Sequence, residues 1–270
     1  MVGGRVRRSG LLATGVVAAL GAVLAAGWAV ESHRKGDGPS HAASPSGPSG
    51  DSGPSRSAAP GKSPAPGGTP GSARGRVVNG RTQPPTVRSP ESASGRYVVA
   101  RGTARPPSGA RGTTVRYAVE MERGLPFDVT EFAATVHRVL NDPRSWGHGG
   151  RMRFVRVDGG PVAFRVALSS PALTDRLCAP LVTGGELSCR QGVRSVINAR
   201  RWGTGVPWYR GDLAAYREYV VNHEVGHALG HGHERCPGPG RRAPVMVQQT
   251  KSLYGCRPNP WPFPQVGPAH

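Results

Sequence analysis

The sequence contains one dense run of histidines, His223-Glu224-Val225-Gly226-His227-Ala228-Leu229-Gly230-His231-Gly232-His233. Asp212 can cap a helix that leads into this run, because apolar residues recur at helical spacing after it. His223 and His227 are one helical turn apart, so both imidazoles can reach the same metal ion. Glu224 lies beside the first of them, where it can take a proton from a metal-bound water without binding the metal itself.

Two histidines compete for the place of third ligand. In a continuous helix His231 would lie about 12 Å beyond His223, too far for one ion to bridge. Gly230 comes first, and glycine at a helix C-terminus readily adopts the left-handed conformation that turns the chain back. We therefore expect His233 to complete the metal site and His231 to point away. Three His ligands leave a fourth position for water, as in catalytic zinc sites.

The run resembles the signature H-E-x-x-H-x-x-G-x-x-H of the metzincin metallopeptidases. The resemblance implies a zincin-like fold with a mixed sheet, an active-site helix, bound Zn²⁺ and a methionine turn near the metal. In Pro244-Val245-Met246-Val247-Gln248 the candidate for that turn is Met246. An aromatic residue often found two positions after this methionine is replaced by Gln248, which leaves the subfamily open.

A wider region, from about Tyr97 to Pro264, resembles a family of exported actinobacterial zincin-like proteins of unknown function. This resemblance implies a zincin fold and an envelope location, and no particular substrate. The stretches that carry it are Leu140-Asn141-Asp142-Pro143, Leu177-Cys178-Ala179-Pro180, Asn222-His223-Glu224-Val225-Gly226-His227, Ala243-Pro244-Val245-Met246 and Asn259-Pro260-Trp261-Pro262.

Composition divides the chain into three parts. Residues 1–30 carry three arginines followed by an uncharged run of about 20 residues, enough to span a bilayer. An uncleaved membrane anchor is favoured over a cleaved signal peptide, and either would send the rest out of the cytoplasm. Residues 31–91 are rich in Ser, Gly, Pro and Ala and are expected to form a disordered linker. Residues 92–270 then form one domain.

Within that domain the apolar pattern predicts an α+β fold. A helix is expected from Asp128 to Leu140, with Glu131 completing a capping-box-like start. Strands are expected at 151–157 and 162–168, and the turn Asp158-Gly159-Gly160 between them indicates a hairpin. Further strands are expected at residues 97–99, 115–121 and 193–198.

Four cysteines lie in the expected domain, and an even number in an exported domain indicates two disulfides. Three pairings are possible, and proximity along the chain favours Cys178 with Cys189 and Cys236 with Cys256. A cysteine zinc site is the alternative, but the sequence has no C-x-x-C spacing.

The net charge of +19 is spread over the chain and comes almost entirely from arginine. No aromatic-interleaved basic patch or nucleic-acid motif accompanies it, so a solvated basic surface is expected and nucleic acid is not an expected partner. The charge would also suit a polyanionic cell envelope.

Together these features predict an exported zinc metalloendopeptidase that acts on proteins or peptides at the cell envelope. Glu224 is the expected general base, and His223, His227 and His233 are the expected zinc ligands. One alternative is a catalytically silent zincin-fold protein that binds the cell envelope. Another is a hydrolase of peptidoglycan peptides. The intact Glu224 argues against the silent protein, because a purely structural zinc does not need that residue.

Overall fold

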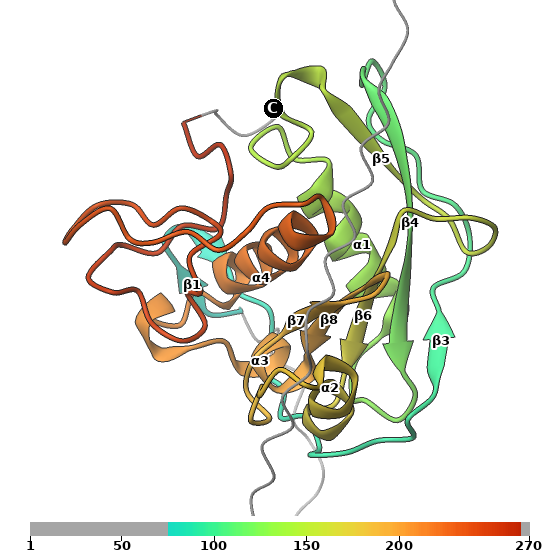
Figure 1. The fold of residues 1–270 in the computed structure, drawn as a ribbon, viewed down its shortest axis with the longest axis horizontal. Helices are drawn as coiled ribbons and strands as arrows, with labels where there is room; N and C mark the ends of the chain where they lie inside the picture. Colours follow the sequence, from blue (N-terminus) through green and yellow to red (C-terminus); the bar gives the residue numbers. More distant parts are fainter. Residues whose placement is uncertain (1–74, 266–270) are drawn as a thin grey trace, which may run out of the picture. The chain divides into compact units, whose positions relative to one another are not determined.

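The computed structural model of the chain describes residues 75–265, which fold into a mixed α+β domain (Figure 1). Its strands are β1 Val77–Val78, β2 Arg81–Thr82, β3 Tyr97–Val99, β4 Thr113–Glu122, β5 Met152–Arg156, β6 Phe164–Ser169, β7 Cys189–Gln191 and β8 Arg194–Asn198. Its helices are α1 Val129–Leu140, α2 Pro171–Cys178, α3 Ala199–Thr204 and α4 Leu213–Ala228, with short 3₁₀ turns at His148–Gly150 and Pro207–Tyr209.

The main sheet is mixed, as the sequence predicts. Its strand order is β3-β4-β6-β8-β7, and β5 also pairs with β4. The neighbours β4, β6 and β8 run parallel, whereas β3 and β7 are antiparallel to their neighbours at the two ends of this order. β1 and β2 form a separate two-stranded sheet.

The prediction of a hairpin over residues 151–168 is wrong. β5 and β6 both run parallel to β4, and Tyr117 of β4 is aligned with Arg156 and with Phe164. Val157 N–H donates to the Tyr117 carbonyl and Ala163 N–H to the Arg116 carbonyl. Consecutive carbonyls of a strand point to opposite sides, so β5 and β6 flank β4. The chain keeps its direction between them instead of reversing.

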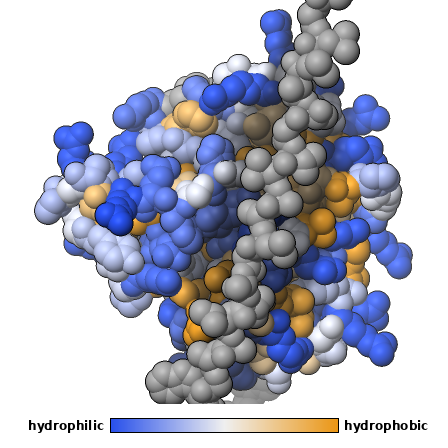
Figure 2. Space-filling model, viewed as in Figure 1, coloured by the Kyte–Doolittle hydropathy of each residue, from blue (hydrophilic) through white to orange (hydrophobic). Residues whose placement is uncertain are grey.

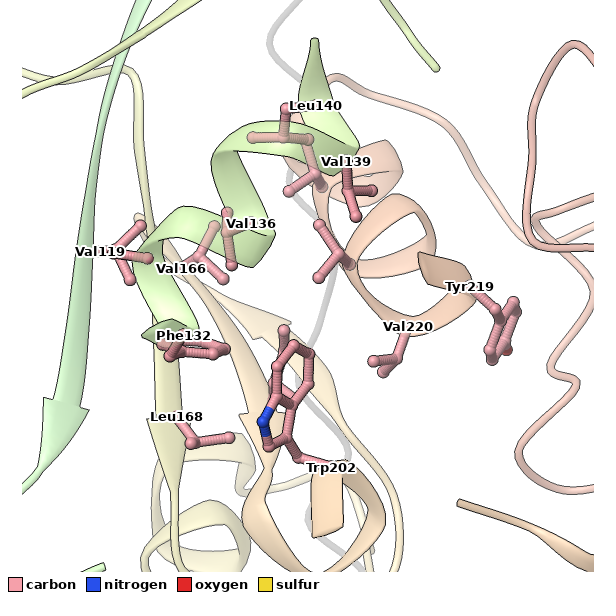
Figure 3. Packing of buried hydrophobic residues seen from close by; sticks show 14 of the residues in the cluster. Val119, Phe132, Val136, Val139, Leu140, Val166, Leu168, Trp202, Tyr219 and Val220 are labelled. Atoms are coloured by element: carbon pink, nitrogen blue, oxygen red, sulfur yellow. The ribbon is translucent and has the colours of Figure 1, made fainter. Parts of the chain in front are cut away.

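One face of the sheet is covered by α1 and α4, which lie side by side (Figure 1). Asp128 caps α1 as expected, because its carboxylate accepts a hydrogen bond of 2.8 Å from Glu131 N–H. Figure 3 shows the main core between these layers, where strands, α1, α3 and α4 all contribute side chains. They include Val119, Val166, Leu168, Phe132, Val136, Leu140, Trp202, Tyr219 and Val220.

The opposite face of β8 carries one of two disulfides. Val196 packs there against the Cys178–Cys189 disulfide, which joins the end of α2 to β7. The second disulfide joins Cys236 to Cys256. The two pairs that proximity favours are therefore confirmed. No free cysteine is left in the described part of the chain, and the alternative of a cysteine zinc site is wrong.

The folded unit includes residues 75–91, which the sequence analysis assigns to the linker. Gln83 is 8% exposed, and its side-chain oxygen accepts from Ala214 N–H at the start of α4. Asn79 and Arg81 both donate to the carboxylate of Asp212, the N-cap of the same helix. The domain boundary expected at residue 92 is therefore too late, because this polar segment is held by hydrogen bonds instead of apolar burial.

The predicted membrane anchor and most of the predicted linker lie N-terminal to the domain. Both the anchor or signal predicted for residues 1–30 and the linker up to residue 74 lie outside the described residues. Between residues 75 and 265, no helix combines the length and the apolar character that crossing a bilayer requires. The face drawn in Figure 2 is mostly hydrophilic, with hydrophobic residues scattered among the hydrophilic ones.

We predict that Gln83→Ala lowers the free energy of unfolding by about 1–3 kcal/mol, because it leaves the N–H of the half-buried Ala214 without its acceptor. Urea denaturation of the purified protein measures this change. Thr86→Ala, an exposed position in the same segment, is the matched control and should unfold like the wild type. Equal unfolding midpoints for the two variants would show that residues 75–91 do not support the domain.

Candidate metal centre

The helix α4 carries the first two predicted ligands into the domain. Asp212 accepts from Ala215 N–H at 3.0 Å, so the N-terminus of α4 is capped as the sequence predicts. His223 is 5% exposed, whereas His227, one turn later, is half-buried. The helix therefore passes from the core to the floor of a cleft.

The C-terminus of α4 turns the chain back at Gly230, as expected. Gly230 has φ of +94°, a conformation that favours glycine. His231 N–H donates to the Gly226 carbonyl at 2.9 Å and Gly230 N–H to the His227 carbonyl at 3.2 Å. These two hydrogen bonds form a Schellman motif, after which His233 returns to the first two histidines.

His223, His227 and His233 form a compact cluster. One ring nitrogen from each lies within 4.8 Å of the others, and Nε2 of His227 is 3.1 Å from Nε2 of His233. In a tetrahedral site with metal–nitrogen distances of about 2.0–2.1 Å, ligand nitrogens stand about 3.3 Å apart. The spacing of the cluster therefore suits a single metal ion held by three imidazoles.

Backbone carbonyls orient two of the rings. His223 Nδ1 lies 2.9 Å from the Val245 carbonyl oxygen, and His227 Nδ1 lies 2.8 Å from the His231 carbonyl oxygen. A carbonyl oxygen only accepts, so Nδ1 carries the proton in both rings and Nε2 keeps its lone pair for a metal. The ring of His231 stacks on Trp146 at 4.2 Å, outside the cluster, as expected for a residue that is not a ligand.

Burial and nearby cations keep the rings neutral. Burial lowers the pKa of His223 to about 3, since a charged imidazolium would lose its hydration there. Burial is also the main cause of the lowered pKa of His227 and of His233. The positive charge of Arg190 adds to the effect at His227, and that of Lys251 adds to it at His233. Neutral imidazole is the form that binds metal ions.

Glu224 places a carboxyl group beside this cluster. It is 4% exposed, and its Oε2 atom has no hydrogen-bond partner among residues 75–265. Burial raises its pKa to about 8, because an isolated carboxylate is costly in a low-dielectric environment. A cation held by the neighbouring imidazoles would supply the missing counter-charge, so the unpaired carboxyl group fits a metal site.

Met246 packs against α4 close to the ligands. It is fully buried, and its side chain lies over Gly226, between His223 and His227 in sequence. A Cβ atom at Gly226 would come within 2.5 Å of Met246 Sδ and 2.7 Å of Trp146 Cζ2. The helix therefore needs glycine at this position for the methionine to approach its backbone.

The turn that carries Met246 is linked to both ligand-bearing segments. Val247 N–H donates to the Pro244 carbonyl at 3.1 Å and closes the turn. The Val245 carbonyl holds the ring of His223, and the Met246 carbonyl accepts from the backbone N–H that follows His233, at 3.0 Å. One short turn thus fixes the first and the third imidazole relative to each other.

The cluster opens into a cleft of roughly 530 Å³. Its walls come from the loop between α2 and β7, from β7 itself and from the segment after Met246. The lining residues are Leu181, Val182, Thr183, Leu187, Ser188, Cys189, Arg190, His223, Glu224, His227, His233, Gln248 and Lys251. All three predicted ligands and the predicted base therefore face one cleft.

The sequence analysis missed most residues of the cleft walls, four of which expose apolar or charged side chains at its rim. Leu181 and Val182 are 61% and 90% exposed, and Arg190 and Lys251 bring two positive charges to the same rim. The sequence gives a partial indication of the two cations, because Arg190 follows a cysteine of a predicted disulfide and Lys251 follows the predicted methionine turn. Gln248, which stands where an aromatic residue is common, also lines the cleft.

Fold and site together define an α+β domain with a candidate metal centre of three histidines. The chain belongs to the family described as Protein of unknown function (DUF3152), whose model matches residues 83–255. The match covers the strands of the main sheet, α4, the three histidines and Met246. No curated protein matches the chain.

We predict that Gly226→Ala destabilises the domain by about 1–3 kcal/mol, although alanine favours an exposed helix by about 1 kcal/mol over glycine. The added methyl group displaces the buried Met246 and Trp146 side chains, so the affinity for divalent metal should fall as well. Urea denaturation and a chelator competition measure the two effects.

Gly232→Ala is the matched control for this change. Gly232 lies in the loop between the ligands, and nothing lies within 4 Å of an added Cβ atom there. This variant should keep both stability and metal affinity. If Gly226→Ala behaves in the same way, the packing of Met246 on α4 does not maintain the site.

Proposed function

We propose that this chain is an extracytoplasmic zinc metallopeptidase that hydrolyses peptide bonds in proteins or peptides at the cell envelope. The observation that carries the proposal is the cluster of three imidazoles beside a buried, unpaired carboxyl group in one cleft. We further infer a metzincin-type zincin fold. Its support is the arrangement of α4, the turn at Gly230 and Met246 packed against the helix.

The donor set favours zinc over other divalent metals. Three imidazole nitrogens in tetrahedral spacing suit Zn²⁺, whereas Mg²⁺ and Ca²⁺ prefer oxygen ligands in larger shells. Three protein ligands also leave one coordination position open, as catalytic sites do. A zinc ion bound there would lower the pKa of a bound water and polarise a substrate carbonyl.

Each residue of the site then has a definite role. The carboxylate of Glu224 takes the proton of the attacking water and passes it to the leaving amine. Its backbone is held by Ser195, whose hydroxyl donates to the Glu224 carbonyl at 2.8 Å. The Val245 and His231 carbonyls keep Nε2 of His223 and of His227 free to bind the metal.

An edge strand beside the cleft supports a peptide as the substrate. β7 pairs with β8 on one side and ends the strand order of the main sheet. Two of its residues, Cys189 and Arg190, line the cleft. An extended peptide can add to such an edge through main-chain hydrogen bonds, which favours recognition of a segment within a chain.

The disulfides support a location outside the cytoplasm, because such bonds persist in oxidising compartments. With the anchor expected at residues 1–30, the domain would act near the membrane surface. A catalytically silent envelope-binding protein is the competing function. The buried Glu224 carboxyl group argues against it, since burying an unpaired carboxyl group is costly and serves no structural zinc.

Glu224→Gln tests the peptidase directly. The amide keeps the size of the side chain and cannot accept the proton, so turnover should fall about 10²–10⁴-fold while one zinc per chain is retained. Metal analysis and cleavage of a peptide library measure the two quantities, and His223→Ala, which should lose the zinc, is the control. Zinc content without cleavage by the wild type would favour the silent binding protein, and cleavage of the library by Glu224→Gln at the wild-type rate would remove Glu224 as the base.

The location is tested by the state of the thiols. In the cells that make the protein, we expect a maleimide reagent to label none of its four cysteines before reduction and all four afterwards. Mass spectrometry of the labelled chain gives the count. Free thiols without any reductant would contradict the proposed compartment.

A further inference from the structure

Two cations border the cleft on separate segments. Arg190 is exposed on β7, and Lys251 is exposed in the segment that follows Met246. Neither side chain forms a salt bridge or a side-chain hydrogen bond with another residue of the described chain. Most partly buried arginines of this domain are paired, as Arg194 is with Glu120. These two charges are therefore available to a ligand.

The residues that line the cleft include two cations and a single carboxyl group. Glu224 is that carboxyl group, and it lines the cleft together with the three histidines. Within the loop between α2 and β7, Glu186 forms ion pairs with Arg200 and Arg201. Asp175 accepts hydrogen bonds from the Thr183 hydroxyl and from Gly185 N–H. The cleft thus carries an excess of positive charge before any metal is bound.

The positions of the two cations are held by covalent constraints. Arg190 directly follows Cys189, whose disulfide fixes the start of β7 to the end of α2. Lys251 lies within the loop that the Cys236–Cys256 disulfide closes, and its N–H donates to the Gln248 carbonyl at 2.9 Å. The backbone that carries the two charges is therefore held before a ligand binds, so binding has to order only the two side chains.

We propose that Arg190 and Lys251 bind a carboxylate of the substrate, so that the preferred peptides carry a negative charge close to the cleaved bond. This inference rests on the peptidase activity proposed above. The carboxylate can come from an Asp or Glu side chain or from a free C-terminus. Charge-assisted hydrogen bonds of this kind distinguish an acid from its isosteric amide.

The test uses matched peptides and the zinc-loaded full chain. One set places Glu against Gln at each position around the cleaved bond, and a second set compares a free C-terminal acid with its amide. We expect a kcat/KM about tenfold higher for one acid series, as charged hydrogen bonds allow, and a smaller ratio at 0.5 M salt. The series that shows the preference identifies the source of the carboxylate.

Charge variants assign the preference to residues. Arg190→Gln and Lys251→Gln should each reduce the acid-to-amide ratio severalfold. Arg138→Gln removes one positive charge from the exposed side of α1, outside the cleft, and should keep the wild-type ratio. An equal loss in all three variants would attribute the preference to net charge and overturn the assignment.

Failure of this inference can be separated from failure of the peptidase. If the wild type cleaves acids and amides equally well, the carboxylate site is wrong and the peptidase stands. If no peptide is cleaved, fluorescence polarisation of the same peptides with zinc-loaded Glu224→Gln measures binding alone. Tighter binding of acids then supports the carboxylate site without the peptidase, and equal binding rejects it.

Discussion

The contact between Gly226 and Met246 is the interaction on which the metal centre depends. Because Gly226 has no side chain, a buried methionine lies against the backbone of α4 between the two helical ligands. Its turn is therefore close enough for the Val245 carbonyl to reach the ring of His223 and for the Met246 carbonyl to hold the loop of His233. Ligands from a helix and from the loop after it are thus positioned by one packing contact. A larger residue at Gly226 would move all of them together.

The same packing brings polar groups into an apolar environment, and that burial costs free energy unless the groups are satisfied. The two Nδ1 atoms find backbone carbonyls, but Oε2 of Glu224 has no hydrogen-bond partner among the described residues. Three neutral imidazoles beside a neutral or weakly ionised carboxyl group gain little from being neighbours. The three Nε2 lone pairs could instead bind a divalent cation, which would provide a counter-charge for Glu224. The arrangement therefore fits a metal ion, because the imidazole and carboxyl groups are already in position and binding requires little rearrangement.

Features of the fold that depend on neighbouring residues could be predicted from the sequence, whereas features that depend on tertiary contacts could not. The helix α4, its Asp212 cap and the turn at Gly230 are local features, and the sequence predicts them because capping and left-handed glycine depend on nearby residues. The direction of β6 depends on which side of β4 it joins, a tertiary choice that the turn residues Asp158-Gly159-Gly160 do not reveal. Residues 75–91 were assigned to a linker because their contribution is made by polar groups such as Gln83. The composition of a segment indicates how much apolar surface it can bury, but it does not reveal hydrogen bonds made by polar side chains.

The cleft shows the same division between local and distant signals. Its floor is made by a motif in continuous sequence, so the chemistry of the site could be inferred from the histidines and Glu224. Its walls come from residues 181–190 and 248–251, which meet only after the sheet and both disulfides have formed. In the proposed peptidase, substrate selection would depend on these walls, which include Arg190, Lys251, Leu181 and Val182. In the proposed peptidase, this charged rim would set specificity separately from catalysis, because the rim can change in charge or shape without disturbing the packing of Met246 on α4.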